Sequence, residues 1–496
     1  MSEVKPTGVM TDAKLVSNAP GIQPQPKKMT LNSNYLDFNS ADGGGTFAQQ
    51  YLPELYEAEV ERFGNRTLSG FLRMVGAEMP MTSDQVIWSE QNRLHVAYKN
   101  CSFKEGTEGD ETSGTIDLTL GNDPSGAIRV GQTILISDSA TGLVTRKAVV
   151  TAVEGETNAE IVVSIYAGKI DTLSGQDIDL FVYGSEFAKG STGMSGSIEP
   201  QFTQFSNRPI ILKDNFEING SDTAQIGWVE VATEDGTSGY LWYLKSESET
   251  RLRFDDYLEM SMVEGVKASN EIKIKYGVAE GANVNIQGTE GLFSAIEQRG
   301  NIYSGFSGAA APGNGALADF DEILKQLDTQ GAIEENMLFL SRSTALDFDD
   351  MIAAMAGGGY AGVAAASYGL FDNEAEMALN FGFSGFRRGS YDFYKTDWKY
   401  LNDATTRGMS NAIDGVMVPA GTTTVYDQML GSNIRRPFLH VRYRASETED
   451  RRYKSWITGS VGGAYTSDLD AMRVNFLSER CLVVQAANNF VLFKGA

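Results

Sequence analysis

The stretch from Thr237 to Gly265 constrains the fold most, because it has the composition of one long helix. It contains no proline, and no glycine lies between Gly239 and Gly265. Its apolar residues recur near the helical period, and opposite charges lie three or four positions apart, which favours a helix. The apolar positions are Leu241, Leu244, Leu252, Leu258 and Met262. With Thr237 or Ser238 as cap and Gly265 as stop, the helix would be roughly 40 Å long and lie across other structure.

Length and composition indicate a globular chain of several domains. The 496 residues are enough for two to four domains. No apolar run approaches the length of a membrane span, and the first residues lack the apolar core of a secretory signal. Cys101 and Cys481 are far apart, which predicts neither a disulfide framework nor a thiolate metal site. We therefore expect folding in a reducing cytoplasm, with no membrane partner.

The charge balance argues against nucleic-acid binding over a broad surface and against catalysis. The chain has 41 Lys and Arg against 65 Asp and Glu, a net charge of −24. Such a surface repels phosphate backbones. His95 and His440 are the two histidines, and histidine is the commonest general base and a frequent zinc ligand. We expect an architectural protein, not an enzyme.

The first half of the chain changes character several times. Residues 1–45 are rich in Pro, Gly, Asn and Ser and by themselves read as a disordered tail. Residues 46–79 follow with a helical pattern, and 80–104 look extended. Residues 105–190 carry 14 acidic and 5 basic residues and alternate short β-rich runs with turns. Those runs are Thr115–Leu120, Gln132–Ser137, Val144–Val153, Glu160–Tyr166 and Ile178–Tyr183, which predicts an inserted all-β domain.

The second half mixes helices with strands. Asp319 begins a capping-box pattern for a helix that stops at Gly331, and Ser343 is the predicted cap of a helix that stops at Gly357. Met337–Ser341 between them reads as a buried strand, and residues 391–496 alternate strands and turns. The predicted fold class is therefore α+β.

The motifs that suggest chemistry do not meet its requirements. The pattern Gly357-x-Gly359-x-x-Gly362 follows a predicted helix, whereas a dinucleotide site needs a strand before it and a helix after it. The acidic segments Glu234–Gly236 and Asp347–Asp350 lack the ligand spacing of an EF-hand calcium site. His95 and His440 lie on strand-like segments, where a surface or interface histidine is the usual case, and neither has a paired base and orienting group nearby. We expect no catalytic residue, no cofactor and no metal.

A basic segment near the C-terminus contrasts with this acidic chain. Its cations are Arg435, Arg436, Arg442, Arg444, Arg451, Arg452 and Lys454. Interleaved aromatic residues, such as Tyr443 and Trp456, permit binding of single-stranded nucleic acid by stacking. Strand alternation places Leu439, Val441 and Tyr443 on one face and His440, Arg442 and Arg444 on the other. Net acidity favours the alternative, in which the guanidinium groups meet carboxylates of an adjacent subunit.

The order of these segments resembles that of tailed-bacteriophage major capsid proteins of the Hong Kong 97 fold, and is most similar to those of crAss-like phages. The residues that carry the resemblance are Gln201–Glu230, Tyr240–Gly265, Tyr391–Asp397 and Arg435–Phe493. Such a protein has an N-terminal arm, an extended loop, a peripheral domain with a long spine helix, and an axial domain. The insertion at 105–190 would interrupt the extended loop.

The resemblance implies a domain organisation. It gives an N-terminal arm at 1–45, an N-terminal helix at 46–79, an extended loop at 80–104 and 191–236, the β-rich insertion at 105–190, a peripheral domain with the spine helix at 237–315, an axial domain at 316–430, and a C-terminal β part at 431–496 that returns to the peripheral domain. The arm contains Leu31, Tyr35, Leu36 and Phe38 without a local core, so these residues are interface candidates together with the six arginines above.

The resemblance also implies a function and partners. The chain would assemble with itself into hexamers and pentamers of an icosahedral virion head, made in the bacterial cytoplasm. Its partners would be a portal protein, auxiliary or head-fibre proteins, a scaffold, and double-stranded DNA held by containment rather than by specific binding. The alternative is a ligand-binding or adhesin-type surface protein that uses the acidic β domain.

Overall fold

The computed structural model describes residues 70–72, 77–106, 111–118, 126–155, 158–170, 177–225, 230–232, 238–269, 272–274, 284–306, 316–331, 333–357, 384–410, 412–427, 432–461 and 465–495. The predicted arm at 1–45, with Leu31, Tyr35, Leu36 and Phe38, lies outside the described residues, as do Gly359 and Gly362. The chain divides into two compact units, one of Ile87–Phe205 and one of the remaining residues.

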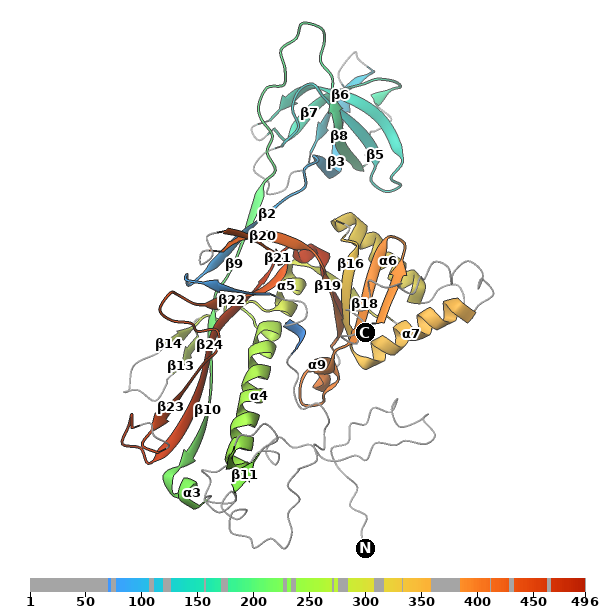
Figure 1. The fold of residues 1–496 in the computed structure, drawn as a ribbon. Helices are drawn as coiled ribbons and strands as arrows, with labels where there is room; N and C mark the ends of the chain where they lie inside the picture. Colours follow the sequence, from blue (N-terminus) through green and yellow to red (C-terminus); the bar gives the residue numbers. More distant parts are fainter. Residues whose placement is uncertain are drawn as a thin grey trace. The chain divides into compact units, whose positions relative to one another are not determined.

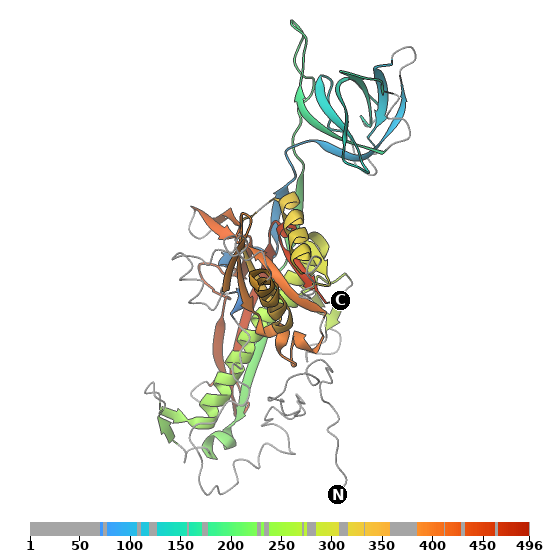
Figure 2. The ribbon, with the colours of Figure 1, turned by 90° about the vertical axis from the view of Figure 1, so that its right-hand side faces the viewer.

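The unit Ile87–Phe205 is built around a closed six-stranded barrel (Figures 1 and 2). Its strands follow the order β3, β4, β7, β6, β5 and β8. Their bounds are β3 Ala97–Gly106, β4 Ser113–Asp117, β5 Gln132–Asp138, β6 Val144–Glu154, β7 Glu160–Ile165 and β8 Asp177–Ser185. All five strands predicted for the insertion are present. Their inward residues form a core of their own, with Ile134, Ile136 and Val163 fully buried.

The sixth barrel strand, β3, was not predicted to belong to this domain, which we expected to begin at residue 105. β3 pairs with β4 on one side and β8 on the other, so the barrel begins at Ala97. Asn100 has a φ of 52°, and the register with β8 shifts between Tyr98 and Cys101. This irregularity breaks the alternation that identifies a strand in a sequence.

A two-stranded ribbon borders the barrel sequence on both sides. β2 (Val86–Gln91) precedes β3, and β9 (Phe202–Asn207) follows β8 along the chain. The two strands pair with each other and with no further strand of the described residues. Parts of the expected extended segments therefore form a paired ribbon, whereas Ala97–Gly106 joins the barrel and Ile210–Asn219 joins a sheet of the other unit.

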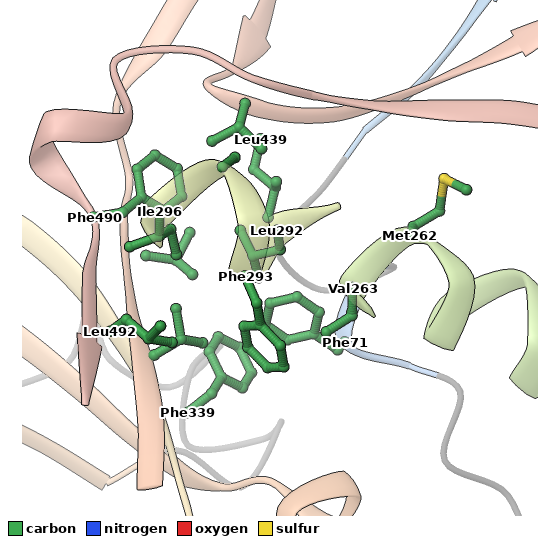
Figure 3. Close-up of a cluster of buried hydrophobic side chains, with 14 of the residues drawn as sticks. Phe71, Met262, Val263, Leu292, Phe293, Ile296, Phe339, Leu439, Phe490 and Leu492 are labelled. Carbon is green, nitrogen blue, oxygen red and sulfur yellow. The ribbon is translucent and has the colours of Figure 1, made fainter. Parts of the chain in front are cut away.

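The second unit contains a six-stranded sheet that is buried on both faces. Its order is β15 (Asn301–Ser304), β25 (Val491–Lys494), β19 (Ile413–Pro419), β16 (Glu335–Leu340), β18 (Tyr391–Asp397) and β17 (Ser384–Arg388). Leu338 and Leu340 pack in one cluster with residues of α6 (Ala316–Gln330) and α7 (Arg342–Gly357). Phe339, between them on β16, packs in the cluster on the other face (Figure 3). Alternate residues of β16 thus pack in two different hydrophobic cores, one on each face of the sheet.

The long predicted helix packs along the second sheet of this unit. Its path is β1 (Glu78–Met81), β22 (Leu439–Arg444), β24 (Ala471–Val484) and β10 (Ile210–Asn219), with β23 (Lys454–Gly459) also paired to β24. Helix α4 (Leu241–Glu264) lies beside β10 in Figures 1 and 2. Its 24 residues correspond to a length of roughly 36 Å.

The remaining elements are α3 Gly220–Gln225, β11 Glu230–Ala232, β12 Ser238–Tyr240, β13 Ile272–Ile274, β14 Val284–Ile286, α5 Leu292–Arg299, α9 Lys399–Asn402, β20 Thr422–Asp427, β21 Ser432–Pro437 and the 3-10 turns Arg407–Met409 and Ala487–Asn489.

The buried stripe of α4 differs in part from the predicted one. Phe254, Leu258 and Met262 are buried at steps of four residues, whereas Leu252 is 38 % exposed. Phe254 stacks on Phe476 of β24 with ring centroids 5.8 Å apart. Ser238 is not the cap, because it pairs with Ala232 in the β11–β12 hairpin. The helix instead begins at Leu241.

For α6 and α7, the predicted C-terminal ends agree with the structure better than the predicted N-terminal starts. α7 ends at Gly357 and α6 is followed by Gly331, as expected. α6 begins at Ala316, before Asp319. The cap of α7 is Ser341 rather than Ser343, since the Thr344 backbone N–H donates to Ser341 Oγ at 3.4 Å. The mixed α+β class is confirmed, and in the described part of the chain no helix combines the length and apolarity that crossing a membrane requires.

Candidate subunit interface

The basic segment lies on β22, on the loop that follows it, and on the β20–β21 hairpin before it. β22 is an inner strand between β1 and β24. Leu439 and Val441 are buried as predicted, Arg442, Arg444 and Arg451 are half-buried rather than fully exposed, and Arg452 is exposed. Partial burial of so many guanidinium groups requires carboxylate or carbonyl partners close by.

Glu479 of β24 supplies one such partner to two arginines. Arg444 Nε lies 3.1 Å from Glu479 Oε1, and Arg451 Nε lies 2.7 Å from Glu479 Oε2. The Glu479 residue is only 8 % exposed. Arg444 also pairs with Asp84 and donates from Nη1 to the Thr82 carbonyl at 2.8 Å. These contacts connect β22 and its loop to β24 and to the residues after β1.

Glu78 of β1 is the centre of a second group. It pairs with Arg452, and Arg480 Nη1 lies 3.4 Å from its Oε1. Arg480 Nη2 donates to the Arg452 carbonyl at 2.9 Å, and Arg480 Nε donates to Ser478 Oγ at 2.9 Å. Arg480 was missed in the sequence because it precedes the apolar run of β24. Its alternation with Ser478 is the signal that could have marked it as part of a polar network.

Several of the predicted interface arginines thus form ion pairs with carboxylates of the same chain. Arg435 and Arg436 differ from them. Both lie on β21, in the two-stranded β20–β21 hairpin, where Arg435 is exposed and Arg436 half-buried. Among the described residues no carboxylate forms an ion pair with either. Arg435 and Arg436 therefore still have charge to offer a neighbour.

His440 is not on the surface, contrary to the sequence expectation. It is 1 % exposed, and its Nδ1 lies 3.1 Å from the Pro437 carbonyl. Burial, together with the nearby charge of Arg442, lowers the pKa of His440 to about 4. The imidazole is therefore neutral at neutral pH and belongs to the core of the sheet.

The β2–β9 ribbon presents apolar side chains that sequence reasoning did not single out as interface residues. Ile87 is 60 % exposed and Phe202 is 66 % exposed. On its better covered side, Trp88 is 7 % exposed and its ring lies 6.2 Å from that of Phe205, centroid to centroid. An isolated two-stranded ribbon is at best marginally stable in water. The ribbon therefore has both the exposed apolar surface and the need for a partner.

Asn207, the last residue of β9, is fixed by hydrogen bonds to two other segments. Its Nδ2 donates to the carbonyls of Leu482 and Glu290, at 2.6 and 2.9 Å. Its Oδ1 accepts from the backbone N–H of Glu290 at 2.9 Å and from Thr289 Oγ1 at 3.1 Å. The residue is 1 % exposed. This bonding fixes the position from which the ribbon returns to the sheet.

A cleft of about 410 Å³ lies next to Asn207. Gln85, Arg208, Lys267 and Gln287 are among the residues that line it. Arg208 pairs with Gln287, and Lys267 donates to the Ser206 carbonyl. The residues that line the cleft include no histidine, cysteine or carboxylate.

Comparison with known proteins gives distant structural similarity only. No protein-family model matches the chain, and no curated protein matches it. Among solved structures, the chain is similar to one from Microbacterium phage Oxtober96, with 10 % identity over 93 % of this chain and 100 % of that one and a TM-score of 0.37. A chain from the capsid structure of the cyanophage P-SCSP1u gives 8 % identity, 93 % and 97 % coverage and a TM-score of 0.37.

A third similar structure is the capsid of an empty GTA particle, at 9 % identity, with 88 % of this chain and 100 % of that chain covered and a TM-score of 0.34. TM-scores of this size do not establish a common fold. The function proposed below therefore depends on the features of this chain.

Proposed function

We propose that this chain is a structural subunit of a phage capsid, which assembles with itself into the shell of a virion head. The observation that carries the proposal is the β2–β9 ribbon with its exposed Ile87 and Phe202. A two-stranded ribbon that exposes large apolar side chains is stabilised when a second surface covers them. In a self-assembling shell that surface belongs to another copy of the chain.

The resemblance of the sequence supports the finer form of the proposal. In that form the fold is of the Hong Kong 97 type, the closest relatives are crAss-like phage proteins, and the copies form hexamers and pentamers. The ribbon corresponds to the extended loop, α4 to the spine helix, and the six-stranded sheet with α6 and α7 to the axial domain. Residues 1–45 would be an arm that lies along neighbouring subunits.

The proposed shell encloses double-stranded DNA without gripping it. A net charge of −24 repels phosphates, and several basic-segment arginines are already paired within the chain. Further partners in the proposal are a portal protein, auxiliary or head-fibre proteins and a scaffold. Assembly would take place in the bacterial host cytoplasm, and the finished protein would reside in the virion.

The test compares two sites of equally exposed apolar side chains. Ile87→Asp with Phe202→Asp changes the ribbon, and Leu143→Asp changes a barrel loop position that is 71 % exposed. Each variant is examined by circular dichroism for folding, and by size exclusion and negative-stain electron microscopy for rings or shells. We expect the ribbon variant to fold and stay small, and the Leu143→Asp variant to assemble like the wild type.

Two results would contradict the proposal. One is a wild-type protein that remains monomeric under all assembly conditions, which fits a surface adhesin better. The other is a ribbon variant that forms the same particles as the wild type, since the exposed apolar residues would then have no role in assembly.

A further inference from the structure

The outer surface of the barrel carries a row of side chains that crosses four strands. Phe181 of β8 is opposite Leu135 of β5, and Leu135 is opposite Lys147 of β6. The backbone N–H of Tyr166, directly after β7, donates to the Lys147 carbonyl at 3.0 Å. Because neighbouring strands lie about 4.8 Å apart, this row is roughly 14 Å long.

The aromatic members of this row face solvent. Phe181 is 44 % exposed and Tyr166 is 51 % exposed. Tyr183, two residues after Phe181 on β8, is 48 % exposed, and Lys147 Nζ lies 6.0 Å from the centre of its ring. The Tyr166 hydroxyl donates to Glu186. We refer to Phe181, Leu135, Lys147, Tyr166 and Tyr183 as the aromatic row.

The inward neighbours of these residues hold the row rigid. Leu180 lies between Phe181 and Asp179 on β8 and is 2 % exposed, while Ile134 and Ile136 on either side of Leu135 are fully buried. The barrel is closed, so its strands have no free edges that could shift in register. The backbone positions that carry the rings are therefore held at fixed spacings before any ligand arrives, which lowers the entropic cost of binding.

We propose that the aromatic row is a binding site for a neutral oligosaccharide, with sugar rings stacked on Phe181, Tyr183 and Tyr166. Pyranose rings have apolar C–H faces that pack on aromatic rings, and hydroxyl edges that need polar partners. The Tyr166 and Tyr183 hydroxyls, Glu186 and Lys147 supply those polar partners. The length of the row fits a short linear chain of sugars rather than a single one.

The exposed area distinguishes this ligand from a protein partner. Fully burying one aromatic side chain removes about 150–250 Å² from solvent, so three half-exposed rings offer roughly 300 Å². A stable protein interface needs about 800 Å² on each partner. The row alone is therefore too small for a second copy of the chain, but it is large enough to cover one face of a short oligosaccharide.

The negative charge of the barrel unit favours neutral saccharides over anionic ones. The unit Ile87–Phe205 has 16 acidic and 8 basic residues, and Glu186 lies at the row itself. This acidity disfavours sugars that carry carboxylate or sulfate groups. The inference is independent of self-assembly, because every residue of the row belongs to the barrel unit.

The test uses saturation-transfer NMR on the full chain with chitotetraose as the neutral probe and a hyaluronan tetrasaccharide as the anionic one. We expect transfer to chitotetraose and at least fivefold less to the anionic sugar. Tyr183→Ala and Phe181→Ala should each weaken chitotetraose binding about tenfold, as expected for the loss of one stacked ring. Tyr465→Ala is the matched control, because Tyr465 is 86 % exposed and lies outside the barrel.

Three outcomes would overturn the inference. The first is the absence of transfer to chitotetraose, and the second is an equal effect of Tyr465→Ala. The third is a change of oligomeric state in Tyr183→Ala during sedimentation, since the row would then be a contact between copies. Circular dichroism of each variant confirms that the barrel still folds. The first two outcomes do not depend on whether the wild type forms shells.

Discussion

Replacing Glu479 with glutamine tests whether the buried ion pairs of the basic segment hold the sheet together. The carboxylate lies between the guanidinium groups of Arg444 and Arg451, at 3.1 and 2.7 Å. Glutamine keeps the size and the hydrogen-bonding capacity of the side chain but removes its charge. Both arginines would then remain half-buried with less compensation.

The expected cost follows from the burial of the three side chains. Removing one partner of a fully buried pair costs about 3–5 kcal/mol. Here the Glu479 side chain is 10 % exposed, but those of Arg444 and Arg451 are 24 % and 29 % exposed. Arg444 also keeps Asp84 and the Thr82 carbonyl. We therefore expect Glu479→Gln to cost about 2 kcal/mol of local stability, below the fully buried range.

Hydrogen exchange followed by mass spectrometry measures this cost in the peptides of β22 and β24. A loss of about 2 kcal/mol corresponds to roughly 30-fold faster exchange of their amides. Glu449→Gln is the control, because Glu449 pairs with Lys454 at 2.7 Å and both side chains are largely exposed. That variant should exchange like the wild type. Equal acceleration in both variants, or none in Glu479→Gln, would refute the assignment of stability to the buried pairs.

Three further predictions concern other buried groups and the barrel. The pKa of His440 is lowered to about 4 from an ordinary value near 6.5. As pH falls, the unfolded state therefore takes up a proton on this histidine before the folded state does. The free energy of unfolding should decrease by about 3 kcal/mol between pH 6.5 and 4. In His440→Gln, urea unfolding should show a weaker pH dependence. Asn207→Ala should lower the melting temperature measured by calorimetry, because it removes buried hydrogen bonds to backbone groups of Glu290 and Leu482. Residues 87–205 expressed alone should give a dispersed NMR spectrum, whereas 105–190, which lacks most of β3, should not.

The sequence allowed the elements with strong patterns to be predicted. The five barrel strands of the insertion are β-rich runs separated by turn residues, and α4 has an uninterrupted helical composition, so these patterns located them. β18 at Tyr391–Asp397 lies in the part, 391–496, that was predicted to alternate strands and turns. In contrast, β3 has a left-handed Asn100 and a register shift, so its alternation fails although the barrel requires it.

The interface candidates show a different limit of sequence reasoning. Periodicity indicates which side of a strand is polar, but not what lies opposite it. Along the sequence, Glu78 is far from Arg452, whereas Glu479 is closer to Arg444 and Arg451. Only the pairing of β1, β22 and β24 brings these glutamates next to their arginines. The exposure of Ile87 and Phe202 was equally hidden, because an apolar residue in a strand is ordinarily assigned to a core.

These pairings change what charge reversal should do. From the sequence alone, Arg451→Glu with Arg452→Glu is expected to leave the subunit folded and to block assembly. In the structure Arg451 lies against Glu479 and Arg452 against Glu78. The double variant would place like charges together in a partly buried site, so we now expect it to lower the urea midpoint of the isolated subunit as well as to prevent assembly.

Arg435→Glu with Arg436→Glu separates the two effects. Neither arginine forms an ion pair with a carboxylate in the described part of the chain, and both lie on the β20–β21 hairpin. We expect this variant to keep the wild-type urea midpoint, because no buried pair is lost, and to fail to form rings or shells in electron micrographs. Wild-type assembly should weaken with added salt, since exposed charge pairs between copies are screened. If the Arg435/Arg436 variant instead forms normal particles that fail only to retain DNA, the hairpin cations act on phosphates and do not bind carboxylates of a neighbouring copy.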